Sequence, residues 1–375
     1  MKLTGLALAK SLYEGRDQRA RELKAEGRTV VGYLCNFAPI EIFEAAGLVP
    51  YRIRGDMRER ATEANQYLET YGCPFVRNTF ELALKNRYDF IDGLVMSHAC
   101  DSVQRVYGIW TKYRPHAFTY LFNVPHTVTP ASERFYINEL KQFKAKVEAF
   151  VGKVIDDDAL RSAIELCDGN RKLLTELYAM RQMDPPLISG TEMLELLIAG
   201  TGLPAAEFRT LLNEVKAEVQ TRKTGPKAKS ARLMFYGCIN DDTTLVHLME
   251  ECSSNVVMDD TCIGVRGMLG SVGDTEAMHE SLMRYYFRDF KCPRTYRDSG
   301  VKRFDYLIEA AKQWNAQGVV LYILSFCDTH KLDLVDVRRH LDSHGLPSLV
   351  LEDDYSVSAV ESMRTRIEAF VETVA

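Results

Sequence analysis

Apolar and polar positions follow two different rhythms along the chain. Between residues 29 and 151, short apolar runs such as "TVVGYL", "GLVPYRI", "FIDGLVMSHA" and "HAFTYLFNVP" have the character of buried strands. Segments such as "NTFELALKNR" lie between them and have helical spacing, and a longer helix is expected over residues 132–151. This alternation is typical of a mostly parallel sheet covered by helices.

The rhythm changes to helices alone over residues 152–222 and then returns to strand–helix alternation. The intervening segment "TRKTGPKAKSAR" is basic, contains Gly and Pro, and lacks core residues, which is typical of a linker. The pattern therefore predicts an α/β protein with two doubly wound, mostly parallel-sheet domains and a helical insert between them. The predicted boundaries are an N-terminal helix over 1–28, a first domain over 29–151, the helical segment over 152–222, a linker over 223–230 and a second domain over 231–375.

Composition narrows the class of protein. With 375 residues, 46% hydrophobic and 26% charged, the chain is long enough for two ordinary globular cores. The formal net charge is 47 − 52 = −5, so no overall basic surface favours nucleic acid or an anionic membrane as partner. No apolar run reaches the length of a membrane-spanning helix, and the apolar N-terminal run is too short and too soon charged for a signal peptide. We therefore expect a cytoplasmic protein.

The nine cysteines are the main candidates for chemistry. An odd number in a long chain without an export signal argues against a disulfide framework and favours free thiols or metal ligands. No CxxC pair occurs, which argues against a zinc ribbon, a thioredoxin-like motif or a ferredoxin-type run. The two halves resemble each other at "DGLVMSHACD" and "QGVVLYILSFCD", each an apolar run after Gly that ends in Cys-Asp.

Cys100 and Cys327 occupy these two strand ends. Ligands of open α/β sheets bind outside the carboxyl ends of the strands, so two facing domains would bring the two thiols together. The alternative is a pair of core thiols without a function. Asp101 and Asp328, which follow directly, favour the first interpretation because the chain has left the core there.

Cys73 lies in the stretch "YGCPF". Pro74 suits the first turn of the following helix, which places Cys73 at its N-cap. The helix dipole and the free N–H groups would lower the pKa of a thiol in this position. This favours a ligand or a nucleophile over a packing residue.

Cys262 lies in the glycine-rich loop "MDDTCIGVRGMLGSVGD". Gly264 and Gly267 let the backbone approach something bulky, and Arg266 could meet a phosphate or thioester oxygen. The loop matches neither GxGxxG nor a P-loop, and a flexible surface loop is the alternative. Cys292 follows in "DFKCPRTY", a second Cys-Pro pair whose role the pattern does not define.

The remaining thiols, Cys35, Cys167, Cys238 and Cys252, are interpreted as structural. Three thiolates from separated segments suit a soft metal, and zinc could use the same set, although the histidines match no zinc template. A cysteine–histidine nucleophile pair with His98 or His330 also stays open.

Several segments together resemble the superfamily of 2-hydroxyacyl-CoA dehydratases and class I benzoyl-CoA reductases. They are "APIEIFEAAGLVPYRI", "FNVPH", "MDDTCIGVRG", "CPRTYR", "SFCDTHKLDL" and "GLPSLVLEDD", and the match runs from about residue 30 to the C-terminus. The resemblance implies two α/β domains with helical segments. It also implies a [4Fe–4S] cluster held by Cys73, Cys100 and Cys327, with one iron left open.

The resemblance further implies one-electron chemistry on a CoA thioester, either ketyl-radical dehydration of a 2-hydroxyacyl-CoA or ring reduction of an aromatic acyl-CoA. A separate ATP-hydrolysing iron–sulfur activator would supply the electrons, and this chain has no Walker A motif. The chain looks most like the smaller cluster-bearing subunit of benzoyl-CoA reductase, which pairs with a homologous cluster-bearing subunit.

Three alternatives stay open beside this one. The chain could be a 2-hydroxyacyl-CoA dehydratase subunit or a non-catalytic scaffold subunit. It could also be a homodimeric reductase of small molecules with a double-cubane [8Fe–9S] cluster, in which Cys262 and Cys292 would be additional ligands. Whether the protein is a heterodimer or a homodimer, its substrate would be an acyl-CoA or a small molecule.

Glu41, in "APIE", matches an acidic position of the family and is a candidate proton donor or base. The alternative is a glutamate at a helix start that complements the dipole. His98 is a second candidate for catalysis, and Arg266, Gly264 and Gly267 are candidates for substrate contact.

Overall fold

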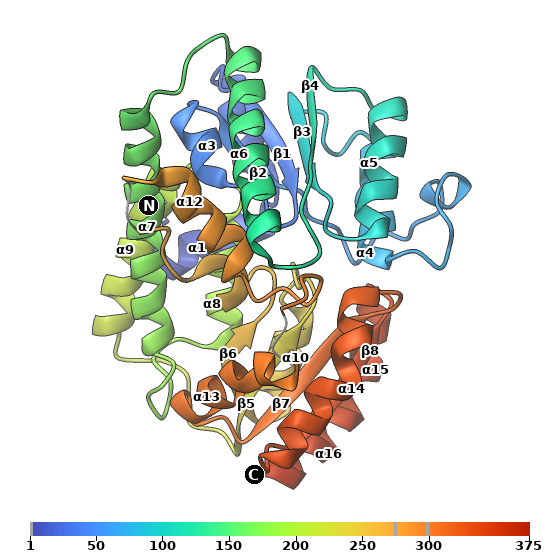
Figure 1. Cartoon of the computed structure of the whole chain (residues 1–375). Helices are drawn as coiled ribbons and strands as arrows, with labels where there is room; N and C mark the ends of the chain where they lie inside the picture. The colour runs from blue at the N-terminus through green and yellow to red at the C-terminus, as the bar shows by residue number, and fades with distance from the viewer. Residues whose placement is uncertain (1–2, 274–275, 298–299) are drawn as a thin grey trace.

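The computed structural model describes residues 3–273, 276–297 and 300–375 and contains two four-stranded sheets. The first sheet is made by β1 (Val30–Leu34), β2 (Val49–Arg52), β3 (Gly93–Ser97) and β4 (Phe118–Phe122). The second is made by β5 (Ala231–Gly237), β6 (Ser254–Asp260), β7 (Gly318–Leu324) and β8 (Ser348–Asp353). Every pairing between these strands is parallel, which confirms the predicted α/β class. Figure 1 shows one sheet above the other.

Both sheets have the same topology. The strand order is β2-β1-β3-β4 in the first and β6-β5-β7-β8 in the second. In each, the order reverses between the first and third strands along the chain, and this switch point is where open α/β sheets bind ligands. The resemblance between the two Cys-Asp stretches thus reflects equivalent positions, because β3 and β7 are both third strands.

Helices connect the strands of the first sheet or follow its last strand. They are α3 (Ile40–Ala45), α4 (Pro74–Leu84), α5 (Asp101–Tyr113) and α6 (Pro130–Val151). Helix α6 begins two residues before the predicted start, because the Thr129 side chain accepts a hydrogen bond from the Ser132 N–H and caps it. The sequence interpretation missed α5, although Val103, Val106 and Trp110 are buried at helical spacing.

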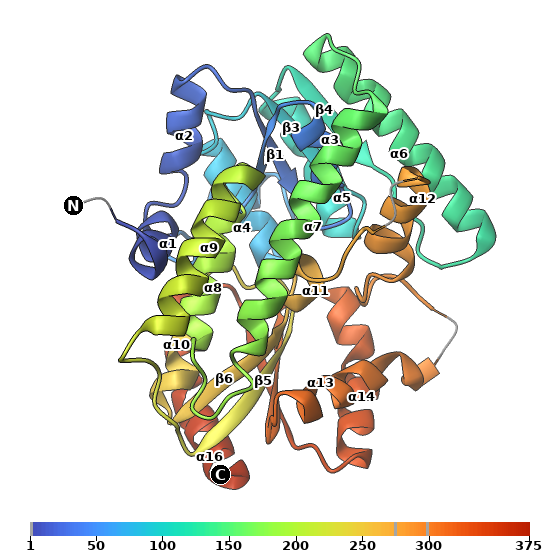
Figure 2. The ribbon, with the colours of Figure 1, turned by 90° about the vertical axis from the view of Figure 1, so that its left-hand side faces the viewer.

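The predicted N-terminal helix is two helices, α1 (Gly5–Glu14) and α2 (Gln18–Ala25). Arg16, between them, has a left-handed backbone with φ 50°, which ends the first helix. The expected helical stretch contains α7 (Asp157–Ala179), α8 (Gly190–Gly200) and α9 (Ala205–Thr221). Figure 2 shows α7 and α9 beside each other on one side of the molecule, and α7 packs on both α9 and α3. The exact domain boundaries stay a prediction.

The second half carries α10 (Thr244–Glu251), α13 (Asp305–Gln313) and α14 (Asp328–Ser343). Helix α14 begins directly after Cys327. The C-terminal helical stretch is divided at Met363 into α15 (Val357–Ser362) and α16 (Arg364–Val374). None of the helices in the described ranges is long and apolar enough to cross a membrane.

An irregular segment between β6 and α13 joins the two halves. It contains α11 (Val265–Met268), α12 (Met278–Met283), the π-helical turn η2 (Arg284–Arg288) and the 3-10 turn η3 (Gly300–Phe304). In Figure 1, α12 lies beside α6 of the first half, and the two helices are in contact. The Tyr136 and Phe287 rings stack there with centroids 5.1 Å apart. This crossing packs a segment of the second half onto the first sheet's helices.

Candidate functional site

The three predicted cluster cysteines are all N-cap residues. Cys73 caps α4, Cys100 caps α5 directly beyond β3, and Cys327 caps α14 beyond β7. The prediction that Cys73 is an N-cap is confirmed, and the other two share the arrangement. The free N–H groups at three helix starts therefore surround the sulfur atoms, which favours negative charge there.

The same three thiols lie within electrostatic range of one another. Burial raises the pKa of the Cys73 thiol, and the neighbouring Cys327 and Cys100 raise it further. Burial likewise raises the pKa of Cys100 to about 11, with Cys327 contributing. The expectation that the N-cap position lowers the pKa of Cys73 is therefore wrong for the net effect. The Phe75 and Val76 N–H groups do lower it, but burial of the thiol outweighs them.

Cys327 is the exception, with a pKa lowered to about 7. A hydrogen bond from the Cys238 thiol is the main cause, and Thr329 and the His330 N–H add to it against burial. The Thr329 hydroxyl lies 3.6 Å from the Cys327 sulfur. Cys238 was interpreted as structural, but its position directly after the central strand β5 was a signal that it joins this group.

Three further thiols form a second group beside the first. Burial, with smaller contributions from the nearby Cys35 and Cys262, raises the pKa of Cys292 to about 12. Burial also raises the pKa of Cys35 to about 12, again with Cys262 contributing. Cys35 directly follows β1 and has a left-handed backbone, φ 77°, which is uncommon for a residue with a side chain and is often found at functional sites. The sequence interpretation did not include Cys35 among the candidate ligands.

Buried arginines surround the thiols with positive charge. Arg294 donates hydrogen bonds to the Ala99 and Val124 carbonyl oxygens, both at 3.0 Å, and interacts electrostatically with Cys292, Cys35 and Cys100. Arg52 and Arg266 both lower the pKa of Cys262, against the larger effect of burial. Positive charge of this kind stabilises thiolates and anionic clusters.

The donor chemistry at this edge fits an iron–sulfur cluster. Thiolates are the ligands that such clusters use, and helix N-termini and arginines suit their negative charge. Within the described ranges, no three His, Cys, Asp or Glu side chains surround a position for one metal ion. A multi-iron cluster is wider than a single ion, and each thiolate binds a different iron. Cluster binding by Cys73, Cys100 and Cys327 stays a prediction.

Glu41 lies in the first turn of α3 and is fully buried. Its two carboxylate oxygens are both occupied, since Arg171 donates to Oε1 at 2.5 Å and the Tyr286 hydroxyl donates to Oε2 at 2.8 Å. Arg171 also binds Asp168 at 2.7 Å. Glu41 is thus a member of a buried ion-pair network, and its predicted role as acid or base stays a prediction. The sequence offered no signal for Arg171, which lies 130 positions away.

His98 lies just beyond β3, and its backbone is held on both sides. Its N–H donates to the Phe122 carbonyl oxygen at 2.8 Å, and its own carbonyl accepts from Arg294 at 3.1 Å. Its ring meets the His126 ring edge-on, with centroids 5.8 Å apart. The residue is near Cys100, and its catalytic role stays a prediction.

The contacts of Arg266 are with the protein itself. Its buried guanidinium donates to the Asp260 side chain at 3.1 Å, to the Asp260 carbonyl at 2.8 Å and to the Gly237 carbonyl at 3.1 Å. A Cβ at Gly264 would lie 2.2 Å from the Asp259 carboxylate, and one at Gly267 would lie 2.2 Å from the Cys262 carbonyl oxygen. The close approach that the glycines permit is therefore made by the chain's own loop, and substrate contact by these residues stays a prediction.

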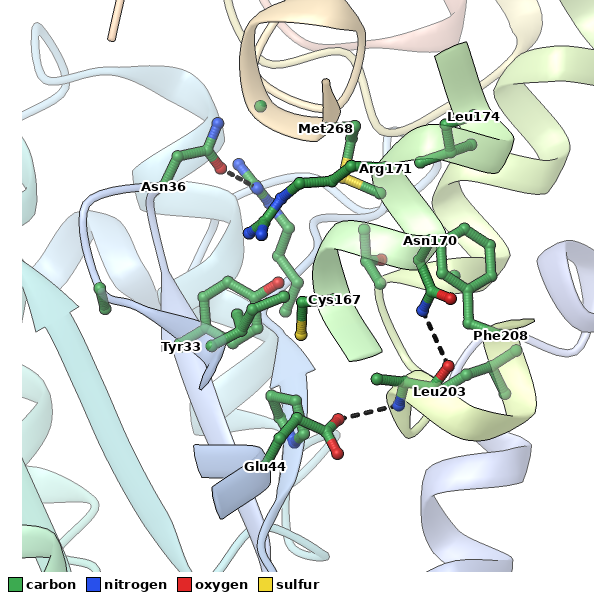
Figure 3. A pocket seen from close by; sticks show the side chains of 18 of the residues that line it. Tyr33, Asn36, Glu44, Cys167, Asn170, Arg171, Leu174, Leu203, Phe208 and Met268 are labelled. Atoms are coloured by element: carbon green, nitrogen blue, oxygen red, sulfur yellow. Dashed lines mark hydrogen bonds between the residues drawn. The ribbon is translucent and has the colours of Figure 1, made fainter. Parts of the chain in front are cut away.

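A separate cavity lies between the first sheet and the helices α7 to α9 (Figure 3). It offers about 80 Å³ to water-sized molecules. Polar side chains on its wall include Tyr33, Asn36, Glu44, Arg52 and Arg171. Figure 3 shows Glu44 at one end, where it accepts a hydrogen bond at 2.8 Å from a backbone N–H at the start of α9, and Asn36 at the other.

The protein is thus an α/β protein with two doubly wound sheets and with cysteines at the switch point of each. The family model of the 2-hydroxyglutaryl-CoA dehydratase D-component matches residues 35–374. The chain belongs to this family, which confirms the resemblance and makes it an enzyme of that type.

Known relatives match almost the whole chain. A benzoyl-CoA reductase subunit from Thauera aromatica is 26% identical, with 98% of this chain and 97% of that protein covered. The (R)-phenyllactyl-CoA dehydratase beta subunit from Clostridium sporogenes is 24% identical, with 94% of each covered. The lactoyl-CoA dehydratase beta subunit from Anaerotignum propionicum is 25% identical, with 94% and 93% covered.

Proposed function

We propose that the chain is the iron–sulfur subunit of an ATP-activated, low-potential acyl-CoA reductase of the benzoyl-CoA reductase type. Its reaction is the reduction of an aromatic acyl-CoA in successive one-electron steps at an open-site [4Fe–4S] cluster. The observation that carries the proposal is the meeting of three N-cap thiols, Cys73, Cys100 and Cys327, at the facing edges of two sheets. Similarity over nearly the full length of the Thauera aromatica benzoyl-CoA reductase subunit supports it.

In this proposal the three cysteines hold the cluster and leave one iron free. The bound cluster supplies single electrons at low potential. The chain's own contribution is to fix the thiolates at helix starts and to place the positive charge of Arg294 near Cys100. Burial and hydrogen bonds to sulfur, such as the one that Cys238 donates to Cys327, tune the group that the thiolates hold.

The proposal includes partners in the cytoplasm. The relatives are named as subunits, so we infer that this chain forms a heterodimer with a homologous, cluster-bearing partner. A separate iron–sulfur activator would hydrolyse ATP and deliver the electrons. The substrate would be an acyl-CoA.

Dehydration of a 2-hydroxyacyl-CoA is the nearest alternative reaction, because two relatives are named as phenyllactyl-CoA and lactoyl-CoA dehydratases. The two reactions give different products from matched substrates. A reductase forms a ring-reduced acyl-CoA, whereas a dehydratase forms an enoyl-CoA and water. Chromatography of both incubations separates them.

A second candidate is a homodimeric reductase of small molecules with a double-cubane [8Fe–9S] cluster. The observation that favours it is the second thiol group, Cys35, Cys262 and Cys292, whose members are electrostatic neighbours of one another and of the first group through Cys100. These three thiols together with Cys73, Cys100 and Cys327 would suit a larger cluster, with Cys35 as a ligand beyond the predicted Cys262 and Cys292.

Metal content of anaerobically purified protein tests these proposals. About four iron and four sulfide per chain supports a single cubane, and about eight iron supports the double cubane. Serine variants of Cys73, Cys100 and Cys327 should lose iron, and Cys252→Ser, a buried thiol at the end of α10, is the matched control. Electron transfer that survives in the iron-free variants would instead favour a scaffold subunit. Iron-free wild type, prepared with its partner and cluster-assembly proteins, would overturn both cluster proposals.

A further inference from the structure

The cavity in Figure 3 is too small for a CoA thioester. About 80 Å³ is open to water-sized molecules, and one buried water needs about 10–15 Å³ on this measure. The space therefore holds roughly five to eight water-sized positions. An occupant would be a molecule of about that many non-hydrogen atoms.

One cation on the cavity wall has no acidic partner. Arg52, in β2, is only 5% exposed, and within the described ranges no carboxylate lies within ion-pair distance of it. Its guanidinium donates to the Asn36 side-chain oxygen, a neutral group. Arg171, on the same wall, differs because Glu41 and Asp168 neutralise it. A buried charge without a partner is costly, so Arg52 favours an anion in the space beside it.

The other titratable groups on the wall do not supply that anion at slightly acidic pH. Burial raises the pKa of Glu44 to about 7, so its carboxyl is largely protonated at pH 6. Burial also raises the pKa values of Tyr33, Tyr286 and Cys167, which are therefore neutral. The rest of the wall is mainly apolar and includes Ile40, Pro50, Leu174, Leu203, Phe208 and Met268.

We propose that this cavity binds a small carboxylic acid with an apolar body, whose carboxylate pairs with Arg52 while Leu174, Leu203 and Phe208 hold its carbon skeleton. The inference goes beyond the proposed function, since it concerns a free acid and a space whose lining does not include Cys73, Cys100 or Cys327. A rival explanation pairs the positive charge of Arg52 with a different anion. Arg52 also interacts with Cys35 and Cys262, so an anionic cluster there would neutralise it instead.

Calorimetric titration of the anaerobically purified protein at pH 6 tests the inference. The probes are isobutyrate, lactate and isovalerate, each compared with its primary amide, which has nearly the same shape without the charge. We expect at least one acid to bind, its amide to bind about 10- to 100-fold more weakly, and Arg52→Gln to weaken the acid by a similar factor. Arg52→Lys should retain part of the affinity. Arg339→Gln, an exposed arginine in α14, is the control and should bind as wild type does.

Leu203→Phe provides a test that leaves the charge in place. The larger side chain reduces the cavity, so isovalerate should bind less well while Arg52 and the iron content are unchanged. The inference is overturned if no acid binds, if acid and amide bind equally, or if Arg52→Gln binds the acid as wild type does. It is also overturned in favour of the cluster explanation if Arg52→Gln loses iron and wild type binds the acid only after its iron has been removed. These readouts are binding constants and iron content, so they do not depend on the proposed reductase activity.

Discussion

Replacing Glu41 by Gln should destabilise the protein, because it leaves a buried arginine with half of its counter-charge. Glu41 is fully buried and Arg171 is 5% exposed, so neither charge is strongly screened by water. Removal of one partner from a buried pair costs about 3–5 kcal/mol. Since Arg171 retains Asp168 at 2.7 Å, we expect the lower end, about 3 kcal/mol.

The measurement is the urea midpoint and slope of wild type and variant. Glu165→Gln, at an exposed position on the same helix as Arg171, is the control and should change stability by less than about 0.5 kcal/mol. A double-mutant cycle with Arg171→Met isolates the pair. We expect a coupling energy of about 1–3 kcal/mol, because the two side chains are in direct contact.

The same variant separates a structural role of Glu41 from a catalytic one. If Glu41 only holds the fold, activity per folded molecule stays within a few-fold of wild type, and losses follow the unfolded fraction. An unchanged urea midpoint together with lost activity would refute the structural argument and identify Glu41 as the proton donor or base.

Three further outcomes follow from the structure. Burial raises the pKa of Glu44 from 4.5 to about 7, so its stabilising contribution is present below pH 4.5 and is lost as the pH rises past 7. Relative to Glu44→Gln, wild type should therefore lose about 2 kcal/mol of unfolding free energy between pH 4.5 and 8, a value reduced for the partial exposure of the side chain. Urea titrations at each pH measure this loss. Gly267→Ala places a Cβ 2.2 Å from the Cys262 carbonyl and 2.5 Å from the Asn36 amide, so thermal unfolding should show a loss of about 1–3 kcal/mol, whereas Gly108→Ala in open space should not destabilise. Anaerobic chelation of iron should lower the melting temperature of wild type, because the thiolates bind metal only when the folded chain brings them together, and an unchanged melting temperature would contradict this.

The positions of the switch points explain why so many thiols lie at the carboxyl edges of the two sheets. Cys35, Cys100, Cys238 and Cys327 each lie just beyond one of the two central strands of a sheet. The helices after central strands diverge to opposite faces there, which leaves an open crevice at the carboxyl edge. Two sheets of equal topology that face each other at this edge place two such crevices together.

The sequence alone determined the features that depend on near neighbours. Apolar runs and helical spacing predicted two parallel α/β units. A strand buried on both faces gives a continuous apolar run, and a helix buried on one face gives apolar residues at helical spacing, so both can be recognised from neighbouring residues. Pro74 after Cys73 predicted a helix N-cap, because this signal also depends only on adjacent residues. The equivalent Cys-Asp ends of β3 and β7 placed Cys100 and Cys327 at one kind of edge.

Only the tertiary structure decided which distant groups meet. The burial that raises the Cys73 pKa above the effect of its N-cap depends on how closely the two halves pack, and no local pattern measures that. Arg171 lies beside Glu41 because α7 packs on α3, and α7 also lines the cavity beside Arg52, which has no carboxylate partner among the described residues. Contacts of this kind join positions more than a hundred residues apart, and their geometry is set by packing of whole elements rather than by the preferences of adjacent residues.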